Sequence, residues 1–227
     1  MSDIQLISKQ FGGNSANALC ITNKYIKDED WERISYYLEH NTGIISLEFS
    51  GVKISSAGLF SLAEIVKNFL NLKELKLDWN DLSELSSEFD YLVESLIQSN
   101  INILYLNNNK INHNLYHSLT KLVKHAVNLS FIDLRWNEIN DDGAKVLLEV
   151  LKKNTYIQYL NIVGNKILNN KLLSEINDCL MRNKQFQENQ SKNPEFNSTS
   201  HSMMNLRKSY EEKDLLNSVG NGKKFLI

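Results

Sequence analysis

The chain has 227 residues, of which 42% are hydrophobic, so it can build a real core and is not disordered throughout. Its 25 Lys and Arg residues nearly balance its 27 Asp and Glu residues, which gives a formal net charge of −2. That balance provides no overall positive field, and it argues against binding to nucleic acid or to an anionic membrane surface.

Residues 1–13 are expected to form an N-terminal extension. They lack the basic stretch and apolar run of a secretion signal, and no run of 18 or more apolar residues follows anywhere. Cys20 and Cys179 fit no metal or redox spacing, which excludes a disulfide framework and is typical of a reducing compartment. We therefore expect a cytoplasmic or cytoskeletal protein that does not span a membrane.

Residues 14–185 consist of six copies of one unit, LxxLxLxxNxL, followed each time by a helical pattern. The asparagine position of the unit falls at 24, 52, 80, 109, 137 and 165, in steps of 28 or 29. It holds Asn in the last four copies, whereas the first two have Lys24 and Val52 and are interpreted as an atypical capping end.

The pattern inside each unit changes from strand to helix. Alternation at LxL predicts a short strand with one buried face, and a spacing such as Leu59, Leu62, Val66 predicts a helix behind it. The expected fold is therefore an α/β solenoid of about six 28-residue strand-helix units with a parallel sheet. We expect the Asn side chains to bond backbone groups and one another's repeats as a ladder.

Units of this length with a helix in each resemble the ribonuclease-inhibitor class of leucine-rich repeats. The resemblance implies strands on a concave face, helices on a convex face, and function carried by the exposed positions. Trp79-Asn80 in LDWNDL, Trp136-Asn137 in LRWNEI, GNKI at 164–167 and FQENQ at 186–190 also resemble the N-terminal repeat domain of the centrosome-linker leucine-rich-repeat coiled-coil family. That family continues into a long coiled coil, whereas this sequence lacks sustained heptads. The resemblance therefore implies a docking piece on a centriole, basal body or axoneme rather than a rod-like linker.

Three columns of side chains are expected to lie exposed on the concave sheet. The first is Ala18, Ser46, Glu74, Ile103, Phe131, Tyr159; the second is Cys20, Glu48, Lys76, Tyr105, Asp133, Asn161; the third is Thr22, Ser50, Asp78, Asn107, Arg135, Val163. Their large apolar members predict a protein-binding patch of Ile103, Tyr105, Phe131 and Tyr159, with Arg135 and Trp136 at its edge. The alternatives are that the chain's own tail covers this patch, or that these are scattered surface aromatics without a role. Each of Trp79 and Trp136 is either a contact anchor or simply packed beside the neighbouring repeat.

Residues 186–227 form an extended or disordered tail in this interpretation. They include the single proline, Pro194, many Ser and Asn residues, and few apolar ones. Met203, Leu206 and Tyr210 are spaced three and four apart, which favours a short helix that forms on a partner. A tail that stays solvated is the alternative.

Catalytic and cofactor signals are weak throughout the sequence. No glycine loop precedes a Lys-Ser/Thr pair, and His113 and His117, four residues apart, lack a placed third ligand. We therefore expect a non-enzyme with no catalytic residues, metal, cofactor or small-molecule substrate.

The resulting hypothesis is a protein-binding scaffold subunit of a microtubule-based structure, namely an axoneme, basal body or centrosome. Its partners would be other proteins, such as cytoskeletal or axonemal subunits, held by the concave face and the tail. The alternative hypotheses are a soluble inhibitor, a GTPase regulator or a signalling adaptor. The sequence leaves open the partner, the choice between centrosome and axoneme, and the oligomeric state.

Overall fold

The computed structural model describes residues 17–192, along which a three-residue strand is followed by a helix six times. The strands are β1 (Ala18–Cys20), β2 (Ser46–Glu48), β3 (Glu74–Lys76), β4 (Ile103–Tyr105), β5 (Phe131–Asp133) and β6 (Tyr159–Asn161). The helices are α2 (Asp30–Glu39), α3 (Ser56–Asn68), α4 (Ser86–Gln98), α5 (Tyr116–His125), α6 (Asp141–Leu151) and α7 (Asn170–Ser191), with a 3₁₀ turn η1 (His113–Leu115) before α5.

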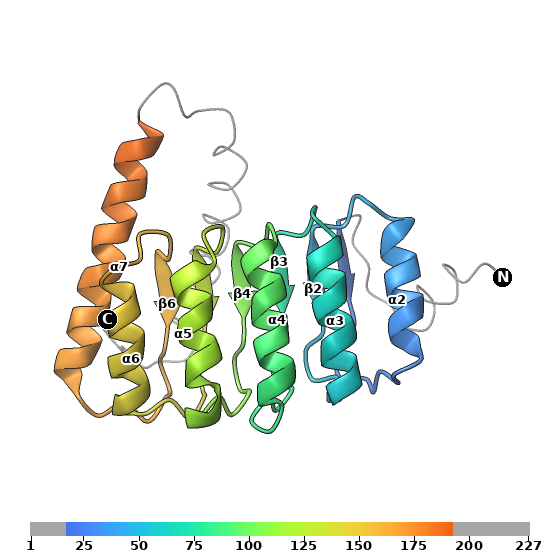
Figure 1. Cartoon of the computed structure of the whole chain (residues 1–227), viewed down its shortest axis with the longest axis horizontal. Helices are drawn as coiled ribbons and strands as arrows, with labels where there is room; N and C mark the ends of the chain where they lie inside the picture. Colours follow the sequence, from blue (N-terminus) through green and yellow to red (C-terminus); the bar gives the residue numbers. More distant parts are fainter. Residues whose placement is uncertain (1–16, 193–227) are drawn as a thin grey trace, which may run out of the picture. The chain divides into compact units, whose positions relative to one another are not determined.

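The six strands form one parallel sheet in chain order, β1 to β6. The register joins corresponding residues of successive units, such as Ala18 to Ser46 and Glu74 to Ile103, so it follows the 28- or 29-residue spacing of the sequence. Helices α2 to α6 lie side by side over one face of this sheet (Figure 1). The predicted α/β architecture, a parallel sheet with helices on one side, is confirmed, and it fits a repeat fold.

The core lies between the sheet and the helices. The middle residue of each strand points into it, and all six are buried: Leu19, Leu47, Leu75, Leu104, Ile132 and Leu160. The helices contribute buried side chains at the predicted helical spacing, among them Leu59, Leu62 and Val66 of α3. Burial of each such side chain is worth roughly 1.5–3 kcal/mol.

An asparagine ladder runs along the array where the chain leaves each strand. The Asn80 N–H donates to Asn109 Oδ1 at 2.9 Å, and the Asn109 N–H donates to Asn137 Oδ1 at 2.9 Å. Each side-chain amide in turn donates to backbone carbonyls, as Asn137 Nδ2 does to Leu106 O at 2.9 Å. The Val52 N–H donates to Asn80 Oδ1 at 3.1 Å, so the unit without its own Asn is still tied to the next. The expected ladder is confirmed.

Helix α7 closes the core at the end of the sixth unit. Asn183 Nδ2 donates to Ile157 O at 2.7 Å, and Arg182 Nη2 donates to Asn154 O at 2.7 Å. The chain divides into two compact units, Met1–Asn183 and Lys184–Ile227, and α7 continues through Gln185, where the sequence predicted the end of the solenoid. The predicted N-terminal extension and the tail beyond residue 192 lie outside the described residues. Within residues 17–192, no helix is both long and apolar enough to cross a bilayer.

Candidate protein-interaction face

The face of the sheet that points away from α2 to α6 carries the first and third residues of every strand, and we call it the far face. Its positions match the first two columns predicted from the sequence, because side chains alternate between the two faces of a strand. The third column lies two residues after the end of each strand. Large rings occupy the far face from β4 onward, whereas β2 and β3 carry charges there.

Three rings form a row across β4, β5 and β6, and we call it the aromatic row. The Tyr105 and Phe131 ring centroids lie 5.2 Å apart, and those of Phe131 and Tyr159 lie 6.0 Å apart. All three side chains are half-buried. Tilted rings at this separation attract one another, which holds the row in place before any partner arrives.

Two residues of the predicted patch are less available than the sequence indicated. Ile103 is only 7% exposed, and it lies in the register between Glu74 and Phe131. The guanidinium of Arg135 is bound to Asp133, with Nη2 2.6 Å from Oδ2, so it neutralises a buried carboxylate. The expectation that Ile103 is exposed is therefore wrong.

A charged network occupies the far face on β2 and β3. Lys76 Nζ lies 3.5 Å from Glu74 Oε1 and 3.9 Å from Glu48 Oε2, and Ser46 Oγ donates to Glu74 Oε2 at 2.7 Å. The same Lys76 ammonium lies 5.4 Å from the centroid of the Tyr105 ring. The network therefore ends on the aromatic row with a cation–π contact.

Asp78 belongs to the third column, two residues after β3 ends. Burial raises the pKa of its carboxyl to about 6, the negative charges of Asp133 and Glu48 add to that rise, and the Asn107 N–H and the Arg135 charge oppose it. The Asn107 N–H donates to Asp78 Oδ1 at 2.9 Å. Among the described residues, no cationic nitrogen lies within ion-pair distance of this carboxylate.

The position before each ladder residue has a positive backbone φ in all six units, and we call it the left-handed column. It holds Asn23 (53°), Gly51 (66°), Trp79 (62°), Asn108 (54°), Trp136 (55°) and Gly164 (77°). Glycine and asparagine adopt this region most readily, whereas a bulky residue there is uncommon. Two of the six units therefore place tryptophan where the backbone favours a smaller residue.

Both tryptophans are exposed, Trp79 to 66% and Trp136 to 60%. The Trp136 ring lies against Gly164 of the next unit, where an added methyl group would come within 2.5 Å of it. Sequence reasoning left open whether these residues pack or make contacts. The signal it missed was the type of residue at the equivalent positions of the other units. Asn and Gly at those positions indicate a left-handed backbone.

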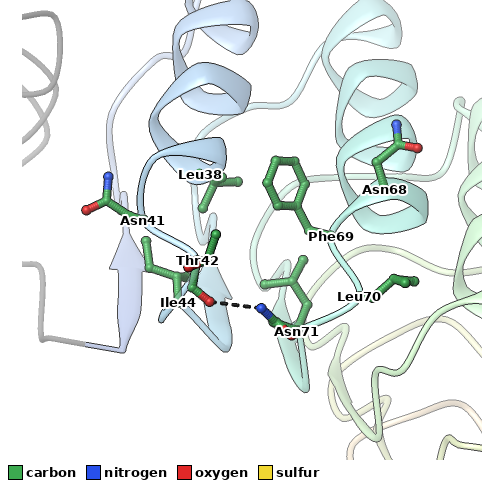
Figure 2. Close-up of a pocket in the computed structure, with 9 residues that line it drawn as sticks. Leu38, Asn41, Thr42, Ile44, Asn68, Phe69, Leu70 and Asn71 are labelled. Carbon is green, nitrogen blue, oxygen red and sulfur yellow. Dashed lines mark hydrogen bonds between the residues drawn. The ribbon is translucent and has the colours of Figure 1, made fainter.

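A hollow of about 280 Å³ lies between the ends of α2 and α3 (Figure 2). Asn71 points toward its partner across the hollow, donating from Nδ2 to Thr42 O at 3.0 Å. The lining carries no charged side chain and consists of Leu38, Asn41, Thr42, Ile44, Asn68, Phe69, Leu70, Asn71 and Leu72. This lining offers no general acid or base. Within residues 17–192 no three His, Cys, Asp or Glu side chains gather as a metal site would require.

The described residues thus bring together Tyr105, Phe131 and Tyr159. Arg135 and Trp136 follow the end of β5, in the same unit as Phe131, by two and three residues. Met203, Leu206 and Tyr210, which the sequence predicted as a second contact, lie outside the described residues.

Comparisons with known proteins place the fold. No protein-family model matches the sequence, and no curated protein does. A Caenorhabditis elegans tropomodulin C-terminal domain has a TM-score of 0.54 at 13% identity, covering 71% of this chain and 97% of that one. Leiomodin-1 actin-binding site 2 has a TM-score of 0.48 at 15% identity, covering 83% of this chain and 91% of that one. These are leucine-rich-repeat-like domains, and at 13% identity the tropomodulin likeness establishes a shared fold.

Proposed function

We propose that this chain is a leucine-rich-repeat protein without enzymatic activity, which binds a protein partner through the far face. The aromatic row of Tyr105, Phe131 and Tyr159 carries the proposal, because three rings lie together on a face that the helices leave uncovered. Half-exposed aromatic rings are typical anchors of protein interfaces.

The assembly we propose is cytoskeletal, and within it a microtubule-based structure such as an axoneme, basal body or centrosome. Support comes from the motif resemblance to the centrosome-linker repeat family. Actin is the partner for which the leiomodin-1 site is named, but a TM-score of 0.48 supports nothing about this chain. Depolymerisation of actin therefore serves only as the comparison with depolymerisation of microtubules in the test.

The test is detergent extraction of cells that carry a tagged full-length chain, with and without depolymerisation of microtubules or of actin. We expect the chain to stay in the insoluble fraction and to leave it only when microtubules are depolymerised. The Phe131→Asp/Tyr159→Asp double variant should be released in either case, because two charges on the row prevent a partner from burying it.

The matched control is Phe60→Asp on the opposite side of the molecule. Phe60 in α3 is also a partly exposed ring with an aromatic neighbour, Tyr91 at 5.3 Å, but it lies on the helical face. It should leave retention unchanged. Extraction of the wild type into the soluble fraction with one cytosolic protein would instead favour an inhibitor, GTPase regulator or adaptor.

A further inference from the structure

The left-handed column holds two residues that the fold itself does not favour. An L residue with a Cβ is strained at φ near 60°, and Asn or Gly relieves this strain in the other four units of the column. Lys53, Asp81 and Lys110, two positions further along the same turns, also have a positive φ, but their side chains are smaller than an indole. Trp79 and Trp136 accept the strain while remaining 66% and 60% exposed, so little burial offsets it at Trp79, while the Trp136 ring packs on Gly164. Strained backbone that the core does not need is typical of functional sites.

The two tryptophans lie along one edge of the array. They occupy equivalent positions two units apart, with Asn108 between them. Two strand spacings place their backbones roughly 10 Å apart. An extended segment of about three residues covers that distance, so one short segment can reach both rings.

The charged side chains that follow the ladder position largely cancel one another. Lys53, Asp81, Lys110, Glu138 and Lys166 occupy the position after the ladder residue and alternate in sign. Lys110 is bound to Asp81, and Lys166 Nζ lies 2.9 Å from Glu138 Oε2. The outer side therefore presents little net charge next to the two indoles.

The charged side chains of the second and third columns do not cancel one another. Lys76 forms ion pairs with Glu48 and Glu74, and Arg135 forms one with Asp133, so these two cations are already engaged. Asp78, the residue directly before Trp79, has no ion-pair partner among the described residues. A cationic side chain that arrives at Trp79 would meet a carboxylate that lacks a counter-ion.

We propose that Trp79 and Trp136 form a docking edge for an extended, arginine- or lysine-bearing segment of a partner protein, with a cation on the Trp79 indole beside Asp78. The indole is the best aromatic acceptor for a cation, and Lys76 on Tyr105 shows the same contact formed within this face. This proposal rests on the proposed function, because the docking edge borders the far face and the proposal specifies the chemistry of the partner that this face would bind.

The test uses the full-length chain and a fluorescein-labelled ten-residue peptide of alternating Arg and Ser, with a Glu-Ser peptide for comparison. Anisotropy should show binding of the Arg peptide and none of the Glu peptide. Trp79→Asn/Trp136→Asn should weaken binding at least tenfold, and Asp78→Asn several-fold. The Trp79→Asn variant should melt no lower than the wild type, since Asn23 and Asn108 hold the same φ naturally.

The control is Tyr25→Ser, which removes a 65% exposed ring outside the left-handed column. It should leave the affinity unchanged. The docking edge is overturned if the wild type fails to bind the Arg peptide, if it binds the Glu peptide equally, or if the double tryptophan variant binds as tightly as the wild type.

This result is separable from the extraction test. If the tryptophan variant binds the peptide normally while the Phe131→Asp/Tyr159→Asp variant is released from the cytoskeleton, the docking edge is contradicted and the proposed function is supported. Loss of peptide binding in the tryptophan variant, with a wild-type chain that is never retained on cytoskeleton, would support the docking edge and contradict the proposed function.

Discussion

Two neighbouring columns of the array, the ladder position and the left-handed column, differ in residue identity, burial and hydrogen bonding. The ladder position holds the same residue in four successive units and bonds to the backbone of the unit before it: Asn80, Asn109, Asn137 and Asn165. The first three are buried, and Asn165, in the last unit, is half-buried. The left-handed column one residue earlier holds Asn, Gly or Trp and includes two of the most exposed large side chains among the described residues.

The difference separates what the fold requires from what it merely tolerates. A buried ladder Asn satisfies N–H and C=O groups that water cannot reach, so its identity is dictated by structure. The left-handed column requires only a φ value, which Gly or Asn meets most cheaply. A tryptophan there is more than this φ value requires.

The largest expected effect comes from breaking the ladder. Asn109→Ala removes the acceptor of the Asn80 N–H and the donor to Leu77 O, both of which are buried. Leaving such groups unsatisfied costs about 1–3 kcal/mol each, so we expect a loss of about 3 kcal/mol in the free energy of unfolding, measured by urea denaturation. The adjacent Asn108→Gly should change it by less than about 1 kcal/mol, because glycine occupies that column in two other units. Similar losses at both positions would abolish the distinction between the columns.

Asp78, just before the left-handed column, gives a pH-dependent effect. Its folded pKa of about 6 lies above its ordinary value of 3.8, so between these pH values the folded state binds a proton that the unfolded state has lost. The contribution of this group to stability is therefore full below about pH 4 and is lost as the pH rises to about 6. Asp78→Asn keeps the oxygen that accepts from the Asn107 N–H and removes the charge.

Denaturation of both proteins at several pH values checks this prediction. Allowing for the partial exposure of Asp78, we expect the variant to gain about 1–2 kcal/mol over the wild type between pH 4 and pH 7. The comparison with the wild type cancels the other carboxyls, such as Asp81, whose pKa is lowered by Lys110. A constant difference across this range would show that Asp78 is not held in an unfavourable charged state.

The sequence predicted those parts of the structure that repeat. Leu75 and Leu104 could be assigned to one face and one register, because identical spacing must stack identical positions when strands pair in parallel. The role of Asn109 followed from the same argument, since a polar residue in an apolar repeat needs backbone partners.

The candidate face was harder to predict, because it depends on neighbours 28 or 29 residues away. Ile103 is apolar at an outward position, and its burial does not follow from the strand pattern of its own unit. The engagement of Arg135 by Asp133 likewise needed side-chain geometry. The backbone strain at Trp79 could have been predicted from the sequence, but only by comparing Trp79 with Gly51 and Asn108 at the equivalent position of other units.

The smallest predicted effect lies within the left-handed column itself. Trp79→Asn should raise the free energy of unfolding by up to about 1 kcal/mol, because asparagine tolerates φ near 60° and the 66% exposed indole contributes little burial. Trp136→Asn should gain less, since its ring also packs on Gly164. Thermal and urea denaturation of the two variants measure this difference. If Trp79→Asn destabilises the chain instead, the indole serves the fold, and the strain at this position needs no partner to explain it.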